Sequence, residues 1–194
     1  MAIGRAMSLS PIRAQLQFLM GPREHVYAVV DAARDNELAV AARSRFGLRL
    51  HTLFEGELAQ YLDHAAPHLI PVRLDCEYVE LWAEHLGRSA GILLLTNADT
   101  DALRAHLRRM FVVTDEHGEE YFFRFYDPRV LRVYLPTCTV EEGHDFFGPI
   151  RRILVESERP GMILRYEVDH RGVKGVEGPL RTAPSDATTR GGRA

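Results

Sequence analysis

Residues 121–139 constrain the fold of this chain more than any other stretch. Five of the first six side chains, from Tyr121 to Tyr126, are aromatic, and an Asp127-Pro128 pair follows them. A second proline, Pro136, comes shortly afterwards. Because proline fixes φ and has no amide hydrogen to donate, a strand has to end here and a helix has to begin. We therefore predict a rigid aromatic corner over residues 121–139, with Asp127 as the N-cap of the helix and Pro128 at its first position.

Composition limits the class of protein. The chain has 194 residues, 46% of them hydrophobic, which is enough for one well-buried core. The formal net charge is −3 and acidic and basic residues are well mixed, so we expect no nucleic-acid partner, because phosphate binding needs a clustered basic face. No run of about eighteen apolar residues occurs, so no transmembrane helix and no membrane insertion are predicted.

Cysteine usage and the N-terminus both favour a cytoplasmic protein. Cys76 and Cys138 are far apart and form no Cys-x-x-Cys pair, so the sequence indicates neither a zinc site nor a redox motif. Residues 1–20 contain two arginines but no uninterrupted apolar core, so we expect no secretory signal.

Upstream of the aromatic corner, short apolar runs alternate with amphipathic segments. Such alternation is typical of a sheet whose parallel strands are joined by helices. The strands are predicted over residues 26–30, 48–54, 68–74 and 90–96, and the helices over 34–46, 58–64, 79–86 and 101–110. Pro71 predicts that its strand is an edge there, or that the missing amide faces away from a neighbour.

Downstream, the pattern changes to hairpins and short helices. Residues 111–114 and 121–126 flank a turn sequence, and residues 150–156 and 162–168 flank another. Thr139 and Glu142 have capping-box spacing and open a further helix. The predicted fold class is α/β, with a mixed, partly parallel sheet and covering helices, followed by antiparallel hairpins and short helices.

Three regions are expected along the chain. Residues 1–24 form an N-terminal segment with a short helix, capped by Ser10 with Pro11 at its first position. Residues 25–168 form the main domain. Residues 169–194 are rich in Gly, Pro, Ser, Thr and Arg with hardly an apolar side chain, so this tail is expected to be disordered.

Motifs that carry chemistry are few. The sequence has no Gly-x-Ser-x-Gly elbow, no phosphate-binding loop and no dinucleotide fingerprint. His64 and His68 are four residues apart, but Pro67 breaks the helix that would align them, so two loop histidines are favoured over a metal pair. We predict no catalytic residue, no metal site and no cofactor.

Several short runs nevertheless occur in the order seen in a known family. They cover residues 27–34, 53–56, 66–70, 103–109, 121–131, 134–139 and 146–149. On these runs the sequence resembles the bacterial type VI secretion adaptor family, whose members are described as effector chaperones and were long catalogued as a domain of unknown function. The resemblance covers about residues 18 to 168, and the run Phe-Arg-Phe-Tyr-Asp-Pro-Arg is its most specific part.

The resemblance implies a cytoplasmic loading factor that is not an enzyme. Such a protein holds a toxic effector, usually by the effector's N-terminal region, and helps to mount it on the spike protein at the tip of the secretion needle. The implied partners are therefore the cognate effector and the spike protein.

The aromatic corner is the candidate partner-binding surface. Arginine and tyrosine supply much of the energy of protein interfaces. We therefore expect Arg124, Tyr126, Asp127, Arg129 and Tyr134 to form or brace such a surface. The alternative, that most of them are core and cap residues, is equally consistent with the sequence, because a corner that defines the fold has the same pattern.

Two other functions remain open. One is a hydrolase-like enzyme with a dispersed carboxylate site, in which Asp31 and Asp127 lie at strand ends, where α/β sheets often bind ligands. It predicts a perturbed pKa and a pocket around the two carboxylates. The other is a self-assembling structural component, which predicts a large symmetric interface.

Overall fold

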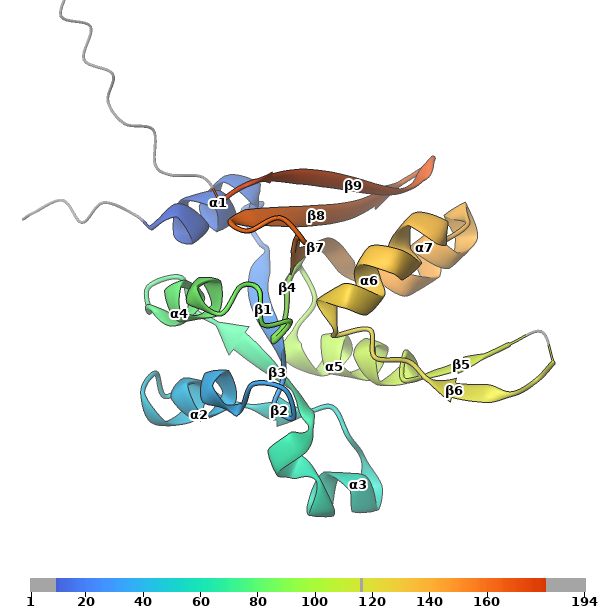
Figure 1. Ribbon diagram of the computed structural model, residues 1–194, viewed down its shortest axis with the longest axis horizontal. Coiled ribbons are helices and arrows are strands. Elements are labelled where there is room, and N and C mark those ends of the chain that lie inside the picture. Colours follow the sequence, from blue (N-terminus) through green and yellow to red (C-terminus); the bar gives the residue numbers. More distant parts are fainter. Residues whose placement is uncertain (1–9, 116, 181–194) are drawn as a thin grey trace, which may run out of the picture.

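One antiparallel sheet of seven strands organises the molecule (Figure 1). The computed structural model describes residues 10–115 and 117–180. The strand order is β2-β3-β1-β4-β7-β8-β9, and every pair of neighbours is antiparallel. The strands are β1 His25–Asp31, β2 His51–Thr52, β3 Pro67–Val72, β4 Gly91–Thr96, β7 Ile150–Glu156, β8 Met162–Asp169 and β9 Gly172–Pro179.

The predicted mixed α/β class is consistent with this arrangement, but the predicted partly parallel sheet is wrong. β1 and β2 run in the same direction, and β3 lies between them in the opposite direction. In the same way β1 lies between β3 and β4. The crossovers from β1 to β2 and from β3 to β4 thus each join two strands of equal direction across a strand of opposite direction, as in a split β-α-β unit. In contrast, β2 and β3 are antiparallel neighbours although a helix lies between them in the chain. The strand-helix alternation indicated the direction of linked strands for the pairs β1 and β2 and β3 and β4, but it was wrong for β2 and β3 and did not show which strands are neighbours.

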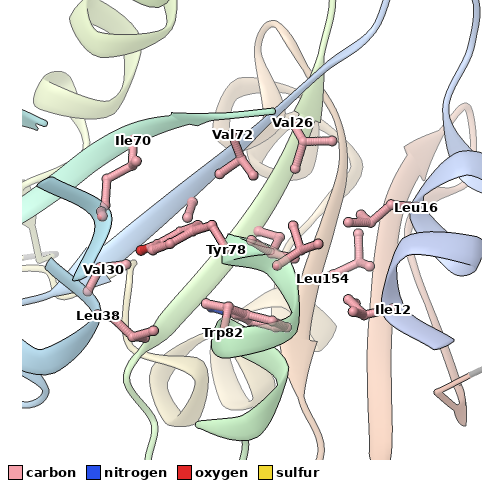
Figure 2. Close-up of a cluster of buried hydrophobic side chains, with 14 of the residues drawn as sticks. Ile12, Leu16, Val26, Val30, Leu38, Ile70, Val72, Tyr78, Trp82 and Leu154 are labelled. Atoms are coloured by element: carbon pink, nitrogen blue, oxygen red, sulfur yellow. The ribbon is translucent and has the colours of Figure 1, made fainter. Parts of the chain in front are cut away.

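Three helices cover one face of the sheet. They are α1 Pro11–Leu19, α2 Asn36–Ser44 and α4 Tyr78–Glu84. Figure 2 shows Leu16 of α1 and Trp82 of α4 in one cluster with Leu154 of the sheet. The short helix predicted for the N-terminal segment is therefore confirmed, and it belongs to the core of the main domain.

The opposite face is covered by α5 Thr100–Arg109, α6 Pro128–Tyr134 and α7 Val140–Phe147. Successive residues of a strand point to opposite faces. Accordingly Ala28 and Val30 of β1 enter the first cluster, whereas Tyr27 and Val29 enter the second. Both helical layers are thus built on the same strands.

The remaining elements lie at the periphery. Helix α3 spans Gly56–Tyr61, and two 3-10 turns, η1 and η2, span Asp63–Ala65 and Leu135–Thr137. Strands β5, Val112–Thr114, and β6, Glu120–Phe122, pair with each other and form the predicted first hairpin, which projects away from the main sheet (Figure 1). No helix within residues 10–115 and 117–180 is long and apolar enough to cross a membrane.

The C-terminal region differs from the prediction of a disordered tail that begins at residue 169. That prediction is wrong for residues 172–179, because β9 pairs with β8 from Met162 opposite Pro179 to Asp169 opposite Gly172. Gly175, one of the glycines that suggested disorder, is required by this pairing, since a Cβ there would lie 2.8 Å from an atom of the Tyr166 ring. Residues 181–194 lie outside the described part of the chain.

Candidate functional site

Asp127 is the N-cap of α6, as predicted. Its Oδ1 atom accepts hydrogen bonds from the backbone amide of Arg129, at 3.0 Å, and from the Arg129 Nε, also at 3.0 Å. Its Oδ2 accepts a third from the Arg129 guanidinium at 2.6 Å. Asp127 is almost fully buried, with 2% of its surface exposed to solvent.

The three hydrogen bonds set the charge of this carboxyl group. Burial alone would raise the pKa of Asp127, but the hydrogen bonds from Arg129 outweigh it and hold the pKa below the ordinary value. Asp127 is therefore ionised at neutral pH, which suits a cap at the positive end of a helix.

A second buried carboxylate lies at the end of β1. Asp31, 1% exposed, accepts a 2.5 Å hydrogen bond from the guanidinium of Arg124. That guanidinium also lies 5.6 Å from the centre of the Tyr126 ring. Burial, followed by the charge of Asp31, raises the pKa of Tyr126 to about 12. The corner is thus joined to β1, an interior strand of the sheet, by a charged contact.

The structure brings four of the five predicted site residues together. Tyr126 and Asp127 are buried, so in this cluster they brace the corner, and only Arg124 and Arg129 present exposed atoms. Tyr134 lies apart from them, at the other end of α6. Its ring packs against those of Phe123 and Phe146, with centroids 4.8 and 5.5 Å away.

Tyr134 lines a surface hollow of about 400 Å³ between α5, β5, α6 and α7. Three rings that touch one another, Phe123, Tyr134 and Phe146, form one apolar wall. The full lining is His106, Arg109, Met110, Val112, Val113, Phe123, Tyr134, Glu142, Asp145 and Phe146. We call this the α5–α7 hollow.

In the α5–α7 hollow, the ionisable side chains of the walls are neutral and those of the rim are charged. His106 Nε2 donates to the carbonyl of Phe146 at 2.9 Å, and burial lowers the pKa of His106. Burial raises the pKa of Tyr134 to about 12. Both side chains are therefore neutral near pH 7. The exposed lining residues Arg109, Glu142 and Asp145 supply the charges.

The hairpin beside this hollow exposes apolar side chains on both of its faces. Val112, Val113, Tyr121 and Phe122 are each between 37% and 55% exposed. The Phe122 ring stacks on Phe111 at 5.2 Å and lies 6.2 Å from the Phe54 ring, and the Tyr121 hydroxyl donates to Asp115 at 3.2 Å.

The sequence prediction found the hairpin, although its second strand ends at Phe122 rather than at Tyr126, and it omitted the hollow. A hairpin with one face on the core alternates apolar and polar residues. Adjacent apolar residues at 112–113 and 121–122 break that alternation. This pattern indicates a hairpin that has apolar side chains on both of its faces.

A separate polar cluster lies near α2 and α4. Within the described part of the chain, Asp35, Glu37 and His85 form the one group of three side chains whose possible metal-ligand atoms lie within 4.8 Å of one another. The guanidinium of Arg88 lies 3.7 Å from Asp35 and 3.5 Å from Glu37, and His85 Nδ1 lies 2.6 Å from Asp35. The ion pairs of Arg88 and the hydrogen bond between His85 and Asp35 thus account for this cluster.

A comparison with known protein families found a match. The model of a family described as "Domain of unknown function (DUF4123)" matches residues 26–145, from β1 into α7. The match contains the hairpin, the aromatic corner and most of the hollow. No curated protein and no solved structure shows significant similarity to the chain.

Proposed function

This chain belongs to the DUF4123 family, a domain of unknown function, and from that premise we propose that it is an adaptor for a type VI secretion system. In this proposal it binds a toxic effector in the cytoplasm, through the N-terminal region of the effector, and helps to load it onto the spike protein. The observation that carries the proposal is the apolar hairpin exposed beside the α5–α7 hollow.

The hairpin needs a partner more than a typical surface element does. All six residues of β5 and β6 are exposed, and four of them are large and apolar. A two-stranded hairpin is marginally stable by itself in water, and contiguous exposed apolar surface marks sites of protein interaction. A bound protein surface would stabilise the hairpin and remove its apolar side chains from water.

The carboxylates of the hydrolase alternative are better explained as structural groups. Acid-base catalysis by two carboxylates requires one of them to hold a proton near neutral pH, and hence a raised pKa. The pKa of Asp127 is instead lowered, and Asp31 and Asp127 are each paired with an arginine. Neither carboxylate lines the α5–α7 hollow. These features favour the adaptor.

Affinity purification from the native host tests the proposal. The tagged chain is expressed while the secretion machinery is active, and co-purifying proteins are identified by mass spectrometry. We expect a spike protein together with a large toxin-like polypeptide, especially one encoded beside this gene. Recovery of neither protein would contradict the adaptor and bring the enzyme alternative forward. A large symmetric self-association in sedimentation would instead support a structural component.

A further inference from the structure

The α5–α7 hollow has the size and chemistry of a pocket for one side chain. Its volume of about 400 Å³ exceeds the ~150 Å³ of a cavity that accommodates benzene, so one large side chain fits with space to spare. Its walls combine three aromatic rings with Met110, Val112 and Val113. The ionisable groups in the walls, His106 and Tyr134, are neutral near pH 7. A large apolar side chain therefore fits this space better than a charged one.

The rim of the hollow is charged with opposite signs on its two sides. On α7, Glu142 and Asp145 lie on one helical face, since residues three apart are neighbours. The side chain of Glu142 accepts a hydrogen bond from the backbone amide of Thr139 in the capping box. The side chain of Asp145 forms no hydrogen bond or ion pair with the described residues. On α5, the Arg109 guanidinium contacts the backbone carbonyl of Ala105 and the ring of His106 but no described carboxylate.

We propose that the hollow binds one segment of the effector in which a large apolar side chain, such as Leu, Met or Phe, is flanked by a base and an acid. The apolar side chain fills the hollow, the base lies against Asp145, and the acid lies against Arg109. Anchor residues in apolar pockets supply most of the energy of an interface, and charges at the rim select the partner and its orientation. This inference rests on the adaptor function proposed above.

A substitution at the apolar wall tests the anchor. Val113→Asp places a charge against the bound side chain, and Val40→Asp is the matched control, because Val40 is 53% exposed on α2, on the other side of the sheet. Binding of the co-purified effector to each purified variant is measured by biolayer interferometry, after circular dichroism has checked folding. We expect Val113→Asp to weaken binding about tenfold or more and Val40→Asp less than about twofold. Should Val113→Asp not fold, Val113→Thr, expected to weaken binding about threefold, takes its place.

A charge reversal tests the rim. Asp145→Lys is expected to weaken binding about tenfold by repelling the base of the effector segment. Glu141→Lys is its control, because Glu141 is an exposed acid of the same helix outside the lining of the hollow. We expect Glu141→Lys to bind within about twofold of the unmodified chain, because exposed charges outside an interface contribute little.

The outcomes separate the two proposals. If the unmodified chain captures no effector, the adaptor function and the pocket both fail. If the unmodified chain binds the effector and the substitutions at Val113 and Asp145 leave its affinity unchanged, the adaptor stands and the pocket is wrong. A loss of equal size in the control variants also overturns the pocket, because the effect would then not depend on position.

Discussion

At the scale of single residues, two arginine-carboxylate pairs brace the aromatic corner. A buried carboxylate is costly unless it is paired and hydrogen-bonded. Asp31 and Asp127 each meet this condition through one arginine, and the two arginines remain about half exposed. The same residues therefore hold the corner in place and leave only part of the predicted binding surface accessible.

The charge of Asp127 gives a prediction for stability against pH. Its folded pKa is lowered, so its contribution to stability is fully present above the unfolded pKa of about 3.9 and is lost as the pH falls through the folded value. Asn retains an oxygen that can cap the helix but loses the charge. We expect Asp127→Asn to be less stable than the unmodified chain by about 1 to 3 kcal/mol at pH 7, with a difference that shrinks below about pH 4.

Urea unfolding measured between pH 7 and pH 3 checks this expectation. Asp145→Asn is the control, because Asp145 is exposed and caps no helix. A difference between Asp127→Asn and the unmodified chain that stays constant down to pH 3 would show that the charge of Asp127 does not stabilise the folded state.

Local signals in the sequence were sufficient to predict the helix cap at Asp127 but not the nearby ion pair of Arg124. Asp127 before Pro128 predicted the N-cap, because capping depends on residues adjacent in the chain. The pairing of Arg124 with Asp31 joins residues 93 positions apart, and no local pattern encodes it. The sequence also could not show that Phe122 is exposed while Phe125 is buried, since both belong to one aromatic run.

At the scale of elements, α1 is an integral part of the fold although the family match begins after it. Ile12 and Leu16 are buried in the first core cluster, and Arg13 forms a 2.8 Å ion pair with Glu80 of α4. We expect Leu16→Ala to lower the free energy of unfolding by about 3 kcal/mol, through lost burial and a residual cavity.

Gln17→Ala is the matched control for this helix, because Gln17 is exposed on its outer face. We expect it to change the free energy of unfolding by less than about 0.5 kcal/mol, as measured by urea denaturation. Equal effects of the two substitutions would mean that α1 is not packed on the sheet as described.

Elements with strong periodicity were predicted and weak ones were not. Helix α5 and strand β4 lie within a residue of their expected bounds. Strand β2 has two residues where seven were expected, because only His51 and Thr52 pair with β3. Strand β9 was missed because its composition, with three glycines and two valines, resembles that of a linker. It is a strand because its backbone pairs with the whole length of β8.

At the scale of the whole molecule, the order of the strands was beyond the reach of the sequence. A helical crossover can join two strands of equal direction with an opposite strand between them, and the helix between β2 and β3 joins two strands of opposite direction. Here β3 and β1 fill those positions, so a partly parallel sheet became an antiparallel one. The choice depends on packing between distant segments, which only the folded chain brings together.

The shared sheet leads to a last prediction, that both core clusters unfold together. Alternate residues of β1 and β4 enter opposite clusters, so both layers of helices pack on the same strands. If one layer unfolds, these strands lose the cover on one face, and we expect the other layer to unfold with them. Trp82 is the single tryptophan and is buried in the first cluster, whereas Leu107 is buried in the second. We expect Leu107→Ala to destabilise the protein by about 3 kcal/mol and to shift the Trp82 fluorescence transition as far as the far-UV circular dichroism transition. If the tryptophan transition stayed in place while the circular dichroism transition moved, the two clusters would be separate folding units, and a partner bound at the α5–α7 hollow would stabilise only one of them.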